Sequence, residues 1–186
     1  MPPVTANDAA RWNARYRDPA ARGADHPAAL LIEEMDSLPA RGLALDVAMG
    51  LGASARLLMA RGLRVVGVDI AEVGVRAARL RAPTLMAVVA DLERFDLPPA
   101  CLDVIVNFRY TQRALWPRFR AWLRPGGWLL IESFNPAQRA RRPNADPSYF
   151  LQPGELREAF RDWRILRCYD SAPERPDCAG IVAIRQ

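Results

Sequence analysis

The hydrophobic residues of this chain fall into short apolar runs that are separated by amphipathic segments of helical spacing. Each run is about as long as one strand. A repeated strand–helix–strand order predicts a parallel sheet that is covered by helices on both faces. The predicted strands lie within residues 43–52, 64–70, 84–90, 102–108 and 127–134, and the predicted helices between them span residues 54–62 and 71–81.

The pattern changes after the fifth run. Residues 135–148 are polar and rich in proline, which predicts a long loop, and residues 153–160 have helical spacing. Two final strands, 163–170 and 179–186, are joined by a short turn-rich stretch and so predict an antiparallel hairpin. The pattern as a whole predicts a single Rossmann-like, doubly wound α/β domain over residues 1–186. Its seven-stranded sheet is mostly parallel and has an antiparallel C-terminal strand.

Two further helices are predicted near the start of the chain. Residues 27–38 begin with proline and are amphipathic, as at the start of many helices. Trp12 and Tyr16 are four residues apart, so they share one face of a short N-terminal helix. Residues 1–40 are therefore expected to form N-terminal helices that act as a lid over a site.

Composition restricts the class of protein. The chain has 186 residues, 51% of them hydrophobic and 25% charged, which suits one domain with a real core. No apolar run approaches the roughly 20 residues that span a bilayer, and the N-terminal stretch has no apolar segment typical of a secretory signal. The three cysteines are odd in number and widely spaced, and there is one histidine, His26. We therefore expect a cytoplasmic protein with reduced thiols, no membrane association and no metal site.

The net charge is +5, and all 26 basic residues are arginine. Arginine binds phosphate and carboxylate in bidentate fashion, so an anionic partner is one interpretation. The other is a coding bias toward arginine, which the abundant Ala and Pro residues favour. Because the arginines are scattered along the sequence, binding to nucleic acid is not expected.

Acidic residues stand at strand ends around a glycine-rich turn. The stretch DVAMGLG, Asp46–Gly52, lies between a predicted strand and a helix, which is the context of a nucleotide-binding turn. Gly50 and Gly52 allow backbone angles closed to other residues and let a ligand touch the chain. Asp69 ends the second strand, 19 residues after Gly50. It is placed to accept hydrogen bonds from a ribose diol, to cap the following helix, or to do both.

The next strand end carries a similar signal. Asp91 follows the third strand, where its carboxylate can accept from an adenine amino group. The backbone amide of Leu92 can donate to a ring nitrogen of the same base. The turn LRPGG, residues 123–127, then leads into the fifth strand.

Together these motifs resemble the class I S-adenosylmethionine-dependent methyltransferases (EC 2.1.1.-) over residues 41–134. The stretches RWNARYRD, NFRYTQRALWPRFRAWLRPGGWLLIESF and FLQPGELREAFRDWRILRCYD extend the resemblance to small bacterial methyltransferases of the tellurite-resistance type. The resemblance implies S-adenosylmethionine as donor and S-adenosylhomocysteine as product. It implies a donor-binding core over 41–134 and an acceptor-side loop, helix and hairpin over 135–186. The implied donor contacts are Asp46, Ala48, Gly50, Gly52, Asp69, Ile70, Asp91, Leu92 and Asn107, with Trp12 and Tyr16 in the lid.

The chain departs from the family pattern in the glycine-rich turn. Ala48 stands where the first glycine is usual, and its methyl group narrows the turn. A dinucleotide-binding dehydrogenase is the rival interpretation of this turn. It requires glycine spacing that Ala53 and Ala55 do not supply, so a donor without phosphates is preferred.

The end of the fourth strand is the candidate acceptor side. In methyltransferases that modify adenine or glutamine this edge carries Asn-Pro-Pro-Tyr, whereas here it is NFRY, and both prolines are absent. Arg109 there suggests that an anionic acceptor, or the donor's carboxylate, is bound at this edge. The alternative is that the arginines pair with Glu132 or Asp91 and hold a loop. The acceptor-side candidates are Asn107, Arg109, Tyr110, Arg113 and Glu132, and Arg141 and Arg142 in the following loop are either substrate contacts or solvated.

The sequence therefore predicts methyl transfer to a small molecule, with an anion or a thiol as candidate acceptor, by a monomer or homodimer. No general base is obligatory for an acceptor that is already an anion, and His26 is expected to be a surface residue. Two alternatives remain: an RNA methyltransferase, which the basic charge suggests, and a non-catalytic domain that binds donor or partner, which Ala48 suggests.

Overall fold

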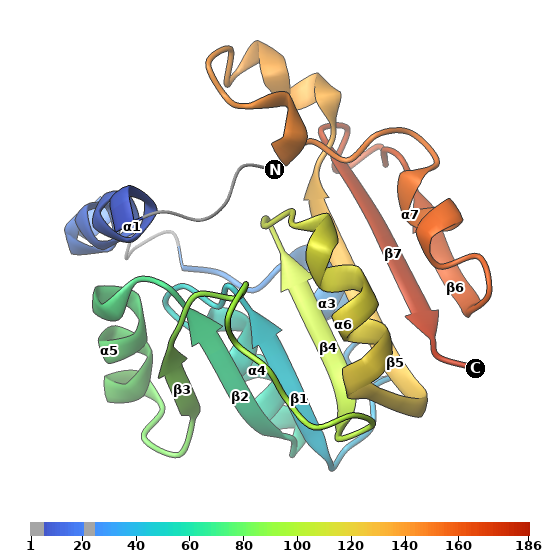
Figure 1. The fold of residues 1–186 in the computed structure, drawn as a ribbon, viewed down its shortest axis with the longest axis horizontal. Helices are drawn as coiled ribbons and strands as arrows, with labels where there is room; N and C mark the ends of the chain where they lie inside the picture. Colours follow the sequence, from blue (N-terminus) through green and yellow to red (C-terminus); the bar gives the residue numbers. More distant parts are fainter. Residues whose placement is uncertain (1–5, 21–24) are drawn as a thin grey trace.

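A computed structural model describes residues 6–20 and 25–186 of the chain. They form one seven-stranded sheet with the strand order β3-β2-β1-β4-β5-β7-β6 (Figure 1). β7 runs antiparallel to β5 and to β6, and the other neighbouring pairs are parallel. The predicted sheet and its closing hairpin are thus confirmed. The strands are β1 (Leu43–Val47), β2 (Arg64–Asp69), β3 (Met86–Val89), β4 (Leu102–Phe108), β5 (Leu123–Phe134), β6 (Arg164–Tyr169) and β7 (Cys178–Ile184).

Helices cover both faces of the sheet, and α1 lies beyond the carboxyl ends of the first strands (Figure 1). The α-helices are α1 (Ala6–Arg17), α3 (Ala29–Glu34), α4 (Ala53–Arg61), α5 (Glu72–Arg81), α6 (Trp116–Trp122) and α7 (Glu155–Ala159). Short 3-10 helices are η1 (Arg113–Leu115), η2 (Pro136–Ala140) and η3 (Pro147–Tyr149). The last two interrupt the stretch that was predicted as one long loop. None of the helices in the described ranges has the length and apolar character that a membrane crossing requires.

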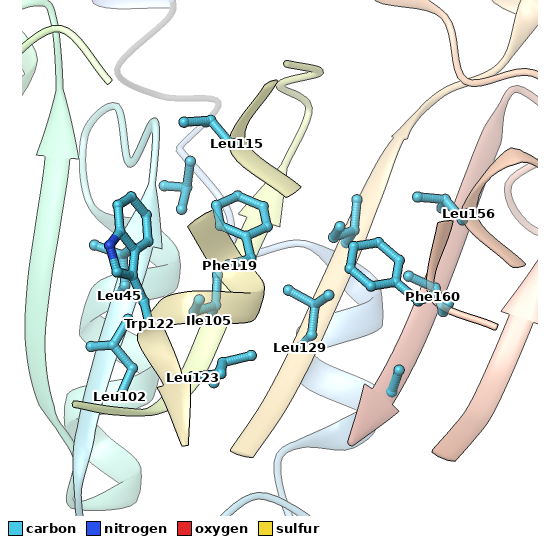
Figure 2. Close-up of a cluster of buried hydrophobic side chains, with 14 of the residues drawn as sticks. Leu45, Leu102, Ile105, Leu115, Phe119, Trp122, Leu123, Leu129, Leu156 and Phe160 are labelled. Carbon is cyan, nitrogen blue, oxygen red and sulfur yellow. The ribbon is translucent and has the colours of Figure 1, made fainter. Parts of the chain in front are cut away.

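The core has two halves, one on each face of the sheet. Alternate residues of β4 face opposite sides, so Val104 and Val106 pack with α3, α4 and α5 while Ile105 packs with α6 and α7. Phe119 and Trp122, three residues apart on α6, are fully or almost fully buried in the second half (Figure 2). This double burial explains why the central strands are continuously apolar rather than alternating.

The segment between β4 and β5 differs from the sequence pattern, which predicts no element there. It folds into η1 and α6, with Pro117 in the first turn of the helix, where its missing N–H is no cost. β5 also begins at Leu123, earlier than predicted, because the proline–glycine turn is itself bonded to the sheet. The Gly126 amide donates to the Arg185 carbonyl at 2.8 Å, and the Arg185 amide donates to the Gly127 carbonyl at 2.9 Å.

The buried face of α6 generates a prediction about stability. Replacing Phe119, which is 0% exposed, with alanine leaves a cavity and should lower the free energy of unfolding by about 3–5 kcal/mol. Leu80→Ala is the control, because Leu80 is 85% exposed and its loss should change stability by less than about 0.5 kcal/mol. Urea unfolding of both variants checks this. Equal small effects would contradict the assignment of α6 to the core.

Candidate active site

A cavity of about 900 Å³ opens at the carboxyl edge of the sheet. It lies between α1 on one side and residues 142–150 on the other, which occupy opposite ends of this edge (Figure 1). Its floor is formed by the ends of β1, β2, β4 and β5. The volume falls within the ~300–1,000 Å³ of small-molecule sites, and this edge is where open α/β sheets bind ligands.

The turn after β1 is built from alternating left-handed residues. Ala48, Gly50 and Gly52 have φ of 54°, 56° and 80°. Ala48 therefore adopts the glycine-like conformation that the family pattern requires, at a cost of about 1–2 kcal/mol for a residue with a Cβ. Met49 fits beneath the turn because Gly67 of β2 lacks a side chain. A Cβ at Gly67 would lie 2.1 Å from the Met49 sulfur.

Asp69, at the end of β2, holds this turn in place. One carboxylate oxygen accepts from the Gly50 amide and the other accepts from the Ala71 amide, both at 2.8 Å. Asp69 thus links the segment before α5 to the glycine-rich turn, but it does not cap the helix as one interpretation expected, because the N-cap residue is Ala71 and the side-chain cap comes from Asn13. Burial raises the pKa of Asp69, and its bonds to backbone amides oppose that rise.

Asp46, in β1, carries an unsatisfied oxygen. Its side chain is 3% exposed and lines the cavity, and its Oδ2 has no hydrogen-bond partner among the described residues. Burial raises the pKa of Asp46 to about 8, while the Ala55 amide at the first turn of α4 partly offsets this and the nearby Asp69 adds to it. A buried carboxyl oxygen without a hydrogen-bond partner lowers the stability of the folded protein until a donor or a cation binds to it.

α1 closes one side of the cavity through two contacts. The side-chain oxygen of Asn13 accepts from the Val73 amide at 2.9 Å, which caps α5, a helix with no side-chain cap of its own. The Tyr16 ring lies against two glycines. A Cβ at Gly50 would come 2.8 Å from the Tyr16 hydroxyl oxygen, and one at Gly74 would come 3.0 Å from the ring. Burial, then the charge of Asp69, raises the pKa of Tyr16.

Trp12 completes the aromatic surface of α1. Its ring stacks on Tyr16 with 5.7 Å between centroids, and both rings line the cavity. The guanidinium groups of Arg11 and Arg15 lie 5.7 and 5.8 Å from the Trp12 centroid. The predicted shared face of Trp12 and Tyr16 is confirmed, and this face points at the cavity.

The opposite side of the cavity carries arginine and hydroxyl groups. Arg109, just past β4, has φ of 58°, and its amide donates to the Glu132 carbonyl at 2.8 Å. Arg142 lies over the Phe134 ring, 4.4 Å from its centroid. Both arginines line the cavity, and neither guanidinium has an ion pair within residues 6–20 and 25–186.

Two other acceptor-side candidates have structural partners. Arg113 pairs with Glu155 at 2.8 Å and donates to the Ser148 and Phe150 carbonyls, so it ties η1 to the loop before α7. Glu132 pairs with Arg175 at 3.1 Å and accepts from the Tyr169 hydroxyl. The loop-holding alternative therefore describes Arg113, with Glu155 rather than Glu132 or Asp91 as its partner.

Hydrogen bonds link Tyr110 through the buried Gln112 to the exposed Glu93. The Tyr110 hydroxyl donates to the Gln112 side-chain oxygen at 2.6 Å, and the Gln112 amide donates to Glu93 at 2.8 Å. Burial raises the pKa of Tyr110, and Asp91 and Glu93 add to the rise. Beside it, the Thr111 hydroxyl donates to the Ser133 hydroxyl at 2.8 Å, and both residues line the cavity.

The structure brings most of the predicted site residues together. Asn107 is fully buried with both amide atoms unpartnered among the described residues, and it lies off the cavity wall. His26 is exposed, as predicted, but at the rim of the cavity. Predicted residues on the wall are Trp12, Tyr16, Asp46, Ala48, Gly50, Asp69, Ile70, Leu92, Arg109, Tyr110 and Arg142, and those off it are Gly52, Asp91, Asn107, Arg113, Glu132 and Arg141.

Sequence reasoning missed several polar residues at the site, among them Thr111 and Ser133 on the cavity wall and Asn13 beside it. Asn13 is one residue from Trp12, but nothing in the sequence signals that it caps a helix 60 residues away. Thr111 follows β4 and Ser133 lies in β5, and the pairing of these strands brings the two residues together. The position of Thr111 shortly after an apolar run was the available signal.

The central part of the chain is similar to a known protein family. Residues 44–127 match a family model described as a methyltransferase domain. A relative from Mycolicibacterium smegmatis, described as a probable S-adenosylmethionine-dependent methyltransferase, is 35% identical over 98 residues. That match covers 49% of this chain and 37% of the relative, so the chain spans just over a third of the relative's length.

Solved structures share the fold over more of the chain. TehB from Haemophilus influenzae has a TM-score of 0.70 at 15% identity, covering 96% of this chain and 67% of TehB. A TehB-like S-adenosylmethionine-dependent methyltransferase from Corynebacterium glutamicum has a TM-score of 0.67 at 17% identity, covering 98% and 100%. These likenesses confirm the fold, and the match of residues 44–127 to a methyltransferase domain supports the resemblance that the sequence indicated.

The environment of Asp46 predicts a dependence of stability on pH. Its folded pKa of about 8 lies above the ordinary value of 3.8, so the folded state binds the proton more tightly than the unfolded state. The stability from this proton is complete below pH ~4 and is lost as pH rises to ~8. The variant Asp46→Asn has no such proton to lose. Its free energy of unfolding, measured relative to that of wild type, should therefore rise between pH 5 and pH 8. The slope is at most ~1.4 kcal/mol per pH unit.

Urea unfolding of wild type and Asp46→Asn at several pH values measures the effect. Asp36→Asn is the matched control, because Asp36 is exposed and away from the cavity, and its curve should run parallel to that of wild type. A difference between wild type and Asp46→Asn that stays constant from pH 5 to pH 8 would contradict the prediction.

Proposed function

We propose that this protein, whose residues 44–127 carry a methyltransferase domain of the class I S-adenosylmethionine-dependent type, transfers methyl groups from S-adenosylmethionine to a small-molecule acceptor. The observation that carries the proposal is Asp46, whose buried, unpartnered oxygen faces a cavity beside the glycine-rich turn. S-adenosylhomocysteine is the expected product. Bound S-adenosylmethionine supplies a methyl group on a positively charged sulfur.

The side chains around the turn fit the donor's polar parts. The Asp46 oxygen is free to accept from the donor's ammonium group, which satisfies both the buried carboxyl and the cation. The left-handed turn places Ala48 and Gly50 at the cavity wall, where their small size leaves room for a ligand close to the backbone. This set of groups supports an amino-acid-bearing donor better than one bearing phosphates.

Residues at the ends of β2 and β3 fit the nucleoside part. Asp69 has two further lone pairs beyond those that bind Gly50 and Ala71, so it is able to accept from a ribose hydroxyl while still holding the turn. Ile70 and Leu92 line the adjoining wall and are suited to the faces of an adenine ring. Asp91 accepts from the Glu93 amide at 2.9 Å and lies off this wall, so Leu92 is the stronger candidate there.

α1 is proposed as the roof of the donor site, and residues 135–160 as the acceptor side. Trp12 and Tyr16 present aromatic faces to the cavity, where a sulfonium would gain cation–π attraction. The work of the protein is then mainly to align donor and acceptor and to exclude water, which is worth up to about 7–11 kcal/mol. An anionic group or a thiol is the proposed acceptor class, since Arg109 and Arg142 face it.

S-adenosylhomocysteine binding tests the proposal. Wild type should bind in the micromolar range, and Asp46→Asn should bind about tenfold or more weakly, because a hydrogen bond to a charged group contributes about 1.5–3 kcal/mol. Binding at pH 7 should also release protons from wild type, since the ligand's ammonium ionises a carboxyl whose pKa is about 8. Calorimetry in two buffers of different ionisation enthalpy measures both quantities.

Asp36→Asn again serves as the matched control and should keep wild-type affinity and proton release. Absence of S-adenosylhomocysteine binding by folded wild type would contradict the proposed function. Tight binding without turnover of any acceptor would favour the non-catalytic alternative, and methylation of RNA alone would favour the nucleic-acid alternative.

A further inference from the structure

We propose that the acceptor is an organic carboxylate with an aromatic or apolar body, held by Arg109 and Arg142 and methylated on a carboxylate oxygen. This inference rests on the proposed function and names the substrate class of the same cavity. It follows from three features of the acceptor side: two unpaired cations, an aromatic wall, and the lack of a proton acceptor among the described residues there.

Arg109 places a positive charge at the cavity, and its backbone has a strained left-handed conformation. It is exposed, has no ion pair or side-chain hydrogen bond with any described residue, and adopts φ of 58°. The hydrogen bond from its amide to the Glu132 carbonyl fixes that left-handed conformation. Backbone strain in a residue with a side chain is typical of functional sites, because the surrounding structure maintains it.

Arg142 supplies a second cation from the other wall. Its guanidinium lies over the Phe134 ring at 4.4 Å, which orients it without neutralising it. Its neighbour Arg141 pairs with Asp177, and Arg113 pairs with Glu155. Arg109 and Arg142 thus differ from Arg113 and Arg141 in having no carboxylate partner among the described residues, and a ligand carboxylate matches their donor geometry.

The wall between these arginines is aromatic. Phe108 and Tyr110 come from the end of β4, Phe134 comes from the end of β5, and Tyr149 and Phe150 come from the loop before α7. An inorganic oxyanion would leave this aromatic surface without contacts. An acceptor with an apolar or aromatic body buries it, at roughly 25 cal/mol per Å² of apolar surface.

The acceptor side offers no suitable base among the residues that the structure describes. Asp146 accepts from the Ser148 amide at 2.8 Å, and that bond lowers its pKa, which makes it a weak proton acceptor. Tyr110 holds its own proton, which it donates to Gln112. His26 adjoins Asp25, which is bound to Arg56 and Arg81 of α4 and α5, on the donor side. The acceptor atom must therefore arrive already ionised.

A carboxylate meets this requirement, because its pKa of about 4 leaves it fully ionised at neutral pH. One carboxylate oxygen forms a bond to the methyl carbon while the bond from that carbon to sulfur breaks, and the bonding pair stays on sulfur. A carboxylic methyl ester and a neutral thioether result, and no proton is transferred. A thiol, with a pKa of about 8.5, would first have to lose a proton.

Ligand binding tests the arginines without requiring turnover. Phenylacetate should bind to the complex of wild type with S-adenosylhomocysteine, and Arg109→Gln and Arg142→Gln should each weaken that binding about tenfold. Both variants should keep wild-type affinity for S-adenosylhomocysteine. Arg139→Gln is the matched control, since Arg139 is an exposed arginine in the same loop that lies off the cavity wall, and it should change neither affinity.

Turnover distinguishes the acceptor classes. With labelled S-adenosylmethionine at saturation, a panel of aryl and alkyl carboxylates should yield methyl esters at a rate that stays level from pH 7 to pH 9. A thiol acceptor such as benzyl mercaptan would instead show a rate that rises up to tenfold per pH unit below its pKa. Selenite and tellurite test for an inorganic oxyanion.

Each outcome separates this inference from the function on which it rests. Wild type that binds S-adenosylhomocysteine but methylates only a thiol or an inorganic oxyanion, or no carboxylate of the panel, overturns the carboxylate proposal and leaves the donor site standing. Loss of S-adenosylhomocysteine binding in Arg109→Gln also overturns it, because Arg109 would then hold the donor's own carboxylate. Failure of wild type to bind S-adenosylhomocysteine would overturn both.

Discussion

The pair of hydrogen bonds from the Gly50 and Ala71 amides to Asp69 holds the candidate site together. A turn with left-handed residues at 48, 50 and 52 leaves the regular strand geometry and is held by hydrogen bonds from outside it. Asp69 supplies it from the neighbouring strand, so the β1–β2 pairing sets the position of the turn. Because both oxygens are bound to backbone, the carboxylate is fixed before any ligand arrives, and it costs little to organise.

Both acidic and basic side chains line the cavity along the sheet edge. Asp25, Asp46 and Asp69 lie at the end nearest α4 and α5, with Arg11 and Arg15 of α1 beside them, while Arg109 and Arg142 lie at the end nearest β4 and β5, with Asp146. Within the described residues, the unpartnered oxygen of Asp46 at one end and the unpaired guanidinium groups of Arg109 and Arg142 at the other form an arrangement that favours a cationic ligand at the first and an anionic ligand at the second. The fold produces it simply, because successive parallel strands deliver their terminal residues to the same edge in the order of the sheet.

The sequence predicted the sheet, its closing hairpin and most of the donor-side wall, because these depend on local patterns. Asp46, Gly50 and Asp69 stand at strand ends that apolar runs define. Other features depend on distant contacts. The Met49 side chain fits beneath its turn because Gly67 has no side chain, and Arg113 forms an ion pair with Glu155. The helix α6 has only seven residues, which is too short to give a clear helical pattern of hydrophobic positions. No window of sequence contains both members of such a pair, so the partner of Arg113 was not predicted.

Two segments that line the cavity lie outside the part of the chain that matches the family model. Residues 44–127 contain the turn, Asp69 and Arg109, but neither α1 nor the loop that carries Arg142. α1 is nevertheless packed against the matched part, since Asn13 caps α5 and Tyr16 occupies space that two glycines leave open. A side chain at either glycine would displace the ring, so the core sequence is matched to this particular roof. The shape of the cavity therefore depends on how α1 and the loop that carries Arg142 pack against the part that matches the family model.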